Sequence, residues 1–284
     1  MSTERTEVFS SVQCTLGEGP LWHPLRQQLF WFDILGKKML SVDDGRTLVW
    51  QFDECVSAAG WLDRDRLFMA SETGLWTFDL STETRTLVCP LEADNPVTRS
   101  NDGRADPWGG FWIGTMGFEA EPGAGAIYRF YKGELRKLVP NVTISNAICF
   151  PADQTCAYYA DTAVGKIMRQ PLDPQDGWPT GVAEIFLDLS AEAFGVDGAV
   201  VDRDGNLWNA QWGAGRVACY SHNGALLETV SVPTPQSSCP AFGGEDMATL
   251  FITTAAEGVE TGLAGQTFMS ATGATGQREH QIIL

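Results

Sequence analysis

The amino-acid sequence predicts an all-β chain folded as a six-bladed β-propeller, a single domain over residues 1–284. Three observations support this prediction. A polar residue, a short apolar run, a turn and a second apolar run ending near an aromatic residue recur six times along the chain. The copies begin 39 to 51 residues apart, and strands repeating every 40 to 50 residues or so are typical of propeller blades. No stretch has the periodicity of an amphipathic helix.

The repeats follow one another from the N-terminus, one for each predicted blade. They are EGPLWHPLRQQLFWFDI (18–34), SAAGWLDRDRLFMASETGLWTF (57–78), NDGRADPWGGFWIGTM (101–116), NAICFPADQTCAYYAD (146–161), DGAVVDRDGNLWNAQW (197–212) and SCPAFGGEDMATLFITT (238–254). The segments Trp108-Gly109-Gly110 and Asp204-Gly205-Asn206 fit hairpin loops. A two-sheet β-sandwich is the alternative fold, but a sandwich has no reason to repeat at this period.

The two ends of the chain are expected to complete the last blade. The segment TGLAGQTFMSATGATG (261–276) can supply its outer strands. Residues Glu7 to Cys14 could close the ring by pairing with the same blade.

The composition excludes several classes of partner. The chain has 19 basic and 36 acidic residues, a net charge of −17, which argues against binding nucleic acid or an anionic membrane surface. No apolar run suits a signal peptide or a membrane span. Seven scattered cysteines without a CxxC pair indicate reduced thiols and a cytoplasmic location. A propeller needs no partner to bury its core, so a monomer would suffice.

The residue that opens each repeat is expected to face the central channel at one height. These six residues, here called the axial ring, are Glu18, Ser57, Asn101, Asn146, Asp197 and Ser238. A wet channel would explain the two serines. It explains Glu18 and Asp197 poorly, because two facing carboxylates repel unless a cation or proton lies between them. Carboxylate and amide oxygens suit Ca²⁺, Mg²⁺, Mn²⁺ or Fe²⁺, and Zn²⁺ less particularly. We therefore expect one divalent metal ion on the axis.

The third repeat adds polar groups at the mouth of the channel. Arg99 lies just before Asn101, and Glu119 follows the second strand that returns to the same rim. Beside a metal ion these three side chains would form a pocket for a polyhydroxylated ligand. Asp33, Asp161 and Trp212 also end second strands near this rim and could support or line the pocket.

Four long motifs resemble the SMP-30/gluconolactonase/luciferin-regenerating-enzyme family of propeller lactonases. They are LGEGPLWHP (16–24), RSNDGRADPWGGFWIGTM (99–116), ISNAICFPAD (144–153) and VDGAVVDRDGNLWNAQWGAGRV (196–217), and SSCPAFGG in the sixth repeat is a weaker match. The resemblance covers nearly the whole chain, and the motifs keep the family's order and spacing.

The resemblance implies a role for each matching residue. Glu18, Asn146 and Asp197 correspond to the metal ligands, and Asp197 also to the suspected general base. Arg99, Asn101 and Glu119 correspond to substrate-binding positions. The implied reaction is metal-dependent hydrolysis of a sugar (aldono-)lactone to the aldonic acid, with Ca²⁺, Zn²⁺, Mn²⁺ or Fe²⁺ activating the carbonyl and the water.

Two other functions remain open from the sequence. A metal-dependent esterase or phosphotriesterase-like hydrolase could use the same scaffold, although it would need a more apolar pocket. A non-catalytic metal-binding regulatory protein would keep Glu18, Asn146 and Asp197 without the polar rim. A Ser-His-Asp triad fits badly, because none of the three histidines opens a repeat or lies near a GxSxG motif.

Overall fold

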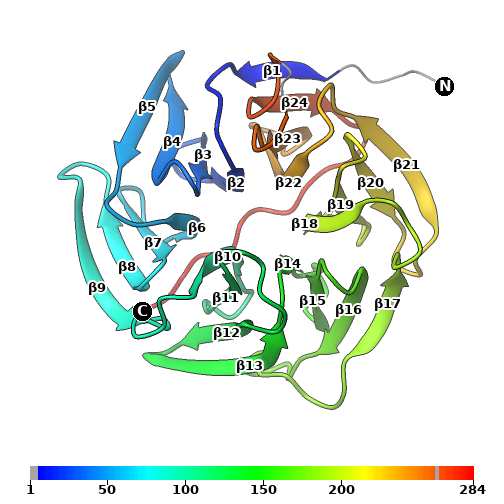
Figure 1. Cartoon of the computed structure of the whole chain (residues 1–284), viewed down its shortest axis with the longest axis horizontal. Helices are drawn as coiled ribbons and strands as arrows, with labels where there is room; N and C mark the ends of the chain where they lie inside the picture. The colour runs from blue at the N-terminus through cyan, green and yellow to red at the C-terminus, as the bar shows by residue number, and fades with distance from the viewer. Residues whose placement is uncertain (1–5, 260–261) are drawn as a thin grey trace.

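The computed structural model describes residues 6–259 and 262–284, and it confirms the six-bladed propeller. Six four-stranded antiparallel sheets stand around a central axis, which Figure 1 views end-on. Within the described ranges there are strands and turns but no helix. It follows that no helix in that part of the chain could cross a membrane.

Each blade runs from an inner strand beside the axis to an outer strand at the rim. The inner strands are β2 (Gly17–His23), β6 (Val56–Trp61), β10 (Thr98–Ala105), β14 (Ser145–Cys149), β18 (Gly195–Val201) and β22 (Ser237–Gly243). The second strands are β3 (Gln28–Asp33), β7 (Arg66–Ser71), β11 (Phe111–Gly117), β15 (Cys156–Asp161), β19 (Leu207–Trp212) and β23 (Thr249–Thr254). The third strands are β4 (Lys38–Asp43), β8 (Gly74–Asp79), β12 (Gly125–Tyr131), β16 (Lys166–Pro171), β20 (Arg216–Tyr220) and β24 (Thr267–Ala271). The outer strands are β5 (Arg46–Gln51), β9 (Thr84–Pro90), β13 (Glu134–Val142), β17 (Glu184–Asp188), β21 (Leu226–Ser231) and β1 (Glu7–Ser10).

The sixth blade joins the two ends of the chain, as the sequence predicts. Its strand order is β1-β24-β23-β22, with Val8 of β1 opposite Phe268 of β24. The expectation for residues 261–276 needs one correction. In its described part that segment forms a single strand of the sheet, β24, because β1 takes the outermost place.

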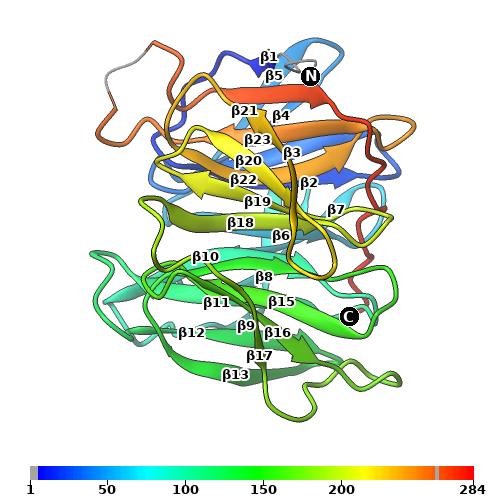
Figure 2. The same cartoon turned by 90° about the vertical axis from the view of Figure 1, so that its right-hand side faces the viewer.

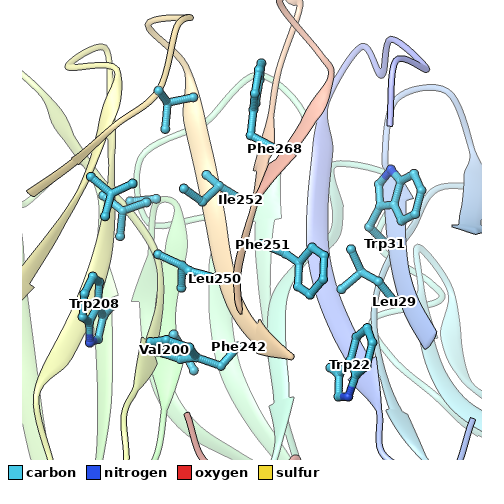
Figure 3. Close-up of a cluster of buried hydrophobic side chains, with 14 of the residues drawn as sticks. Trp22, Leu29, Trp31, Val200, Trp208, Phe242, Leu250, Phe251, Ile252 and Phe268 are labelled. Carbon is cyan, nitrogen blue, oxygen red and sulfur yellow. The ribbon is translucent and has the colours of Figure 1, made fainter. Parts of the chain in front are cut away.

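The core lies between blades, where aromatic side chains from one sheet pack on the next. Trp22 of the first blade stacks on Phe251 of the sixth, with ring centroids 5.5 Å apart. Trp208 of the fifth blade meets Phe242 edge to face, and Figure 3 shows these side chains in one buried cluster. Each blade thereby buries both faces against its neighbours, while the outer strands remain largely exposed.

Each of the six sheets has a local irregularity beside the axis. The pairing register between the inner and second strand shifts at the axial ring in every blade. A β-bulge bends its strand and redirects a side chain. Gly19, directly after Glu18, has φ +54°, and a Cβ there would collide with the carbonyl oxygen of Ser57. Only glycine fits this approach between neighbouring inner strands.

Candidate functional site

Four members of the axial ring line one cavity at the end of the channel where the inner strands begin. Glu18, Asn101, Asn146 and Asp197 project into a space of about 260 Å³. Ser57 and Ser238 are fully buried and bond to neighbouring protein groups, Ser57 to Ser100 and Ser238 to the Gly17 carbonyl. The two serines therefore join adjacent blades, and the cavity is lined by the residues with longer polar side chains.

The carboxylates of Glu18 and Asp197 are buried and close enough to influence each other. Burial, and then the Asp102 carboxylate, raise the pKa of Glu18 to about 8. Burial, and then Glu18 and Asp102, raise the pKa of Asp197 well above its usual range. Each carboxylate accepts one hydrogen bond within the described chain, from the backbone N–H of the next residue, Gly19 or Gly198. This pair of acids is therefore short of positive charge.

Thr162, which directly follows β15, orients the amide of Asn146. The Asn146 Nδ2 donates to Thr162 Oγ1 at 2.8 Å, and Thr162 Oγ1 donates to the Val196 carbonyl at 2.6 Å. With its nitrogen engaged in this way, Asn146 presents Oδ1 on the side of Asn101. Thr162 thus ties the fourth blade to the strand residue that precedes Asp197.

The side chains of Glu18, Asn146 and Asp197 suit a divalent cation. Two carboxylates and one amide oxygen are hard ligands, and burial, followed by the neighbouring carboxylates, raises the pKa values of Glu18 and Asp197. Among residues 6–259 and 262–284, no group of three or more His, Cys, Asp or Glu side chains could hold a metal ion. The predicted set differs from such a group because its third member is an asparagine.

Arg99 and Asn101 form the polar wall beside these acids. Arg99 Nη1 donates to Asn101 Oδ1 at 2.8 Å, and Asn101 Nδ2 donates to the Ser145 carbonyl at 2.9 Å. Burial lowers the pKa of the Arg99 guanidinium, which Glu18 and Glu257 partly offset. Arg99 Nε is buried and has no hydrogen-bond partner in the described part of the chain. Because Arg99 lines the cavity, its guanidinium group is placed beside any ligand there.

Glu119 lies outside the cavity that the other predicted site residues line. It is exposed in the loop after β11, and it is not among the residues that line the cavity. Its backbone N–H donates to Glu121. Two of the candidate rim residues, Asp33 and Asp161, use their carboxylates to accept backbone N–H groups, including those of Leu16 and Ile144.

Several cavity residues were not singled out from the sequence, or only in passing. They are Leu16, Met116, Ile144, Thr162 and Glu257, together with Trp212, which was named as a candidate wall residue. Glu257 is exposed and follows the last repeat by three residues. The available signal is positional: these residues lie just before an inner strand or at the end of a second strand, and both places are at the rim where the inner strands begin. None of the three histidines lines this cavity.

Comparisons with known proteins agree with this fold. A family model described as SMP-30/Gluconolactonase/LRE-like region matches residues 16–256. An L-arabinolactonase of Azospirillum brasilense is 35% identical over 89% of this chain and 85% of its own. A 6-deoxy-6-sulfogluconolactonase of Pseudomonas putida is 33% identical over 85% of this chain and 84% of its own. A crystal structure of a calcium-binding protein, regucalcin, from Agrobacterium tumefaciens superposes with a TM-score of 0.97, with 38% identity over 99% of this chain and 98% of that one.

Proposed function

The chain belongs to the SMP-30/gluconolactonase/LRE-like family, and on that premise we propose that it hydrolyses a sugar lactone to the aldonic acid in the axial cavity. Its enzyme class is lactonase, a hydrolase of cyclic carboxylic esters. The observation that carries the proposal is the joint placement of Glu18, Asn146, Asp197 and Arg99 around one cavity. Relatives named as lactonases support the class, and the cavity lining supports a hydroxylated substrate.

We propose that Glu18, Asn146 and Asp197 hold one divalent cation, of which Ca²⁺, Zn²⁺, Mn²⁺ and Fe²⁺ are candidates. When bound, such an ion supplies Lewis acidity to a carbonyl oxygen and lowers the pKa of water. The matching structure described as a calcium-binding protein supports a divalent ion. Thr162 holds the Asn146 oxygen toward the cavity, so this ligand needs little reorganisation on binding.

The substrate is oriented by the cavity walls. Arg99 lines the cavity and donates from its guanidinium to an oxygen of the sugar lactone, and Asn101 keeps the guanidinium in place through Arg99 Nη1. The apolar side chains of Met116, Ile144 and Trp212 cover carbon faces of the ring. Holding the ester carbonyl beside Asp197 lowers the entropic part of the barrier. In this proposal Glu119 contacts the substrate through movement of its exposed loop toward the cavity.

Asp197 accepts a proton from the attacking water. Its carboxylate is buried, lines the cavity, and accepts only the Gly198 N–H within the described chain, so it has oxygen atoms available for this proton. The same proton can then pass to the ring oxygen as the ester bond breaks, which yields the hydroxyl of the aldonic acid. The seven cysteines are free thiols, which supports a reaction in the reducing cytoplasm.

A pH-indicator assay tests this proposal. Chelator-treated protein is mixed with a panel of five- and six-carbon aldonolactones, with and without each divalent metal. We expect proton release above the spontaneous rate on one or a few lactones, restored by one or more of the metals. A rate equal to the spontaneous background on every lactone would contradict the proposal. A panel of simple esters and phosphotriesters then separates an esterase from a non-catalytic metal-binding protein.

A further inference from the structure

The C-terminal segment crosses the face of the propeller opposite the cavity. Residues 272–284, here called the C-terminal strap, run across the axis in Figure 1 and along one face in Figure 2. The strap contacts the far ends of the inner strands, whereas the cavity lies at their beginnings. Neither the repeat pattern nor the proposed reaction accounts for it.

Hydrogen bonds tie the C-terminal strap to four blades beyond the sixth, from which it leaves. Gln277 Nε2 donates to the carbonyls of Phe150 and Val201 at 3.2 and 3.0 Å. Gln281 Nε2 donates to the Leu62 carbonyl at 2.6 Å, and the Ile283 N–H donates to the Gly109 carbonyl at 2.9 Å. The strap therefore has a defined path across the second, third, fourth and fifth blades.

Glu279 brings a buried negative charge to the axis. Its Oε1 accepts from Arg104 Nη1 at 2.5 Å, and the two side chains are only 7% and 11% exposed. The backbone carbonyl of Glu279 is itself fixed by Trp61 Nε1 at 2.9 Å. A buried ion pair with this geometry is held in place by its surroundings rather than by solvent.

Arg104 connects this pair to the cavity end of the channel. It lies on β10, the strand that carries Arg99 and Asn101, and it acts electrostatically on the buried carboxylate of Asp102. The negative charge of Asp102 in turn raises the pKa of Glu18 and of Asp197. A line of charges thus runs along the axis from the cavity to the C-terminal strap.

The charges on this line balance one divalent cation. Its buried members are the four carboxylates of Glu18, Asp102, Asp197 and Glu279 and the two guanidinium groups of Arg99 and Arg104. When all are ionised, two negative charges remain. Without Glu279 only one negative charge would remain, because two guanidinium groups would then face three carboxylates.

We propose that the C-terminal strap is a positioning element of the metal site: Glu279 holds and neutralises Arg104, and this sets the negative charge that the cation meets. The inference rests on the metal ion of the proposed function. It assigns Arg104 and Glu279 an effect on metal affinity although neither lines the cavity.

Calorimetric titration of chelator-treated protein with Ca²⁺, Zn²⁺, Mn²⁺ or, without oxygen, Fe²⁺ tests the inference. Glu279→Gln removes one negative charge and should weaken metal binding by roughly tenfold. Arg104→Met removes one positive charge and should strengthen it by a similar factor. The double variant R104M/E279Q restores the charge balance and should return the Kd to within about threefold of wild type.

Charge-conserving variants serve as controls, with melting temperatures measured alongside. Glu279→Asp and Arg104→Lys alter shape but not charge, so their Kd values should stay close to wild type even if their stability falls. They also keep the inference testable should a charge-removing variant fail to fold, because a large loss of affinity in a folded E279D or R104K protein contradicts it.

Two outcomes separate this inference from the proposed function. Wild-type protein that binds none of the four candidate ions overturns the metal site and the inference with it. Wild-type protein that binds metal, with E279Q and R104M sharing its Kd or shifting it in the same direction, overturns the inference alone. In that case the C-terminal strap would serve only the stability of the ring.

Discussion

At the scale of single residues, a carboxylate on the axis is distinguished by its surroundings. Asp33 and Asp161 accept several backbone N–H groups and so brace loops. Asp197 and Glu18 each accept only the N–H of the following glycine within the described chain. The carboxylates of Asp33 and Asp161 are thus used in hydrogen bonds to the backbone, whereas those of Asp197 and Glu18 keep oxygen atoms for a cation or a proton.

Replacing Asp197 by asparagine should abolish turnover while the propeller stays folded. The variant keeps the size of the side chain but loses the proposed base and an anionic ligand, so kcat should fall by at least about 100-fold. Steady-state hydrolysis of the best lactone measures this. Asp204→Asn, in an exposed turn of the same blade, is the matched control and should leave kcat unchanged. Near-full activity in D197N would remove Asp197 from the mechanism.

Replacing Thr162 by valine should weaken metal binding through Asn146. Valine has nearly the same shape, but it cannot accept from Asn146 Nδ2 or donate to the Val196 carbonyl. Loss of such a supporting partner costs roughly tenfold in metal affinity. Titration of the metal-free protein measures the Kd, and Thr162→Ser, which keeps the hydroxyl, should preserve it. Equal Kd values for T162V and T162S would show that the hydroxyl has no positioning role.

At the scale of elements, the third blade contains a buried ion pair that is independent of the cavity. Arg129 Nε on β12 donates to Asp106 Oδ2 at 2.6 Å, and both side chains are fully buried. The guanidinium carbon lies 4.4 Å from the Tyr131 ring and 4.5 Å from the Trp178 ring. Asp106 also accepts the N–H groups of Trp108 and Gly110, so this pair supports the hairpin turn of the blade.

Replacing Arg129 by methionine should destabilise the protein by about 3 kcal/mol, because it leaves Asp106 buried without its counter-charge. Urea denaturation followed by tryptophan fluorescence measures the free energy of unfolding. Arg136→Met removes an exposed arginine that pairs with Glu134 in the same blade, and it should change stability little. If both variants have the same stability, the buried pair contributes nothing specific.

At the scale of the whole molecule, the ring of blades concentrates acids on its axis, which links folding to protons. In protein stripped of divalent cations, the pKa of Glu18 is raised from 4.5 to about 8, so the folded chain holds a proton that the unfolded chain releases in this interval. The free energy of unfolding should therefore fall as pH rises from about 5 to 8.

Melting temperatures of chelator-treated protein between pH 5 and 8 measure this linkage. Glu18→Gln removes the titrating group, so its melting temperature should fall less over the same range than that of wild type. A saturating divalent metal should likewise flatten the wild-type curve, since the cation replaces the proton. Parallel curves for wild type and E18Q would contradict the assignment.

The fold followed from the sequence because its signals are local and repeated. The repeats begin about 40 to 50 residues apart, so six copies of a strand-turn-strand pattern predict six sheets, and the structure confirms them. The pairing of β1 with β24 was also predictable, since the sixth blade lacks a fourth strand at the C-terminal end.

What only the tertiary structure decided is which polar residues share one cavity and which charges lie along one axis. The sequence by itself determined the members of the axial ring, because the residues that open the repeats lie at the same height along the channel. It could not place Glu119 outside the cavity, since loop paths do not repeat. Nor could it place Glu279 against Arg104, 175 residues away, because that contact depends on a segment that belongs to no repeat. Short-range patterns specify the blades, whereas long-range burial and charge specify the site that they enclose.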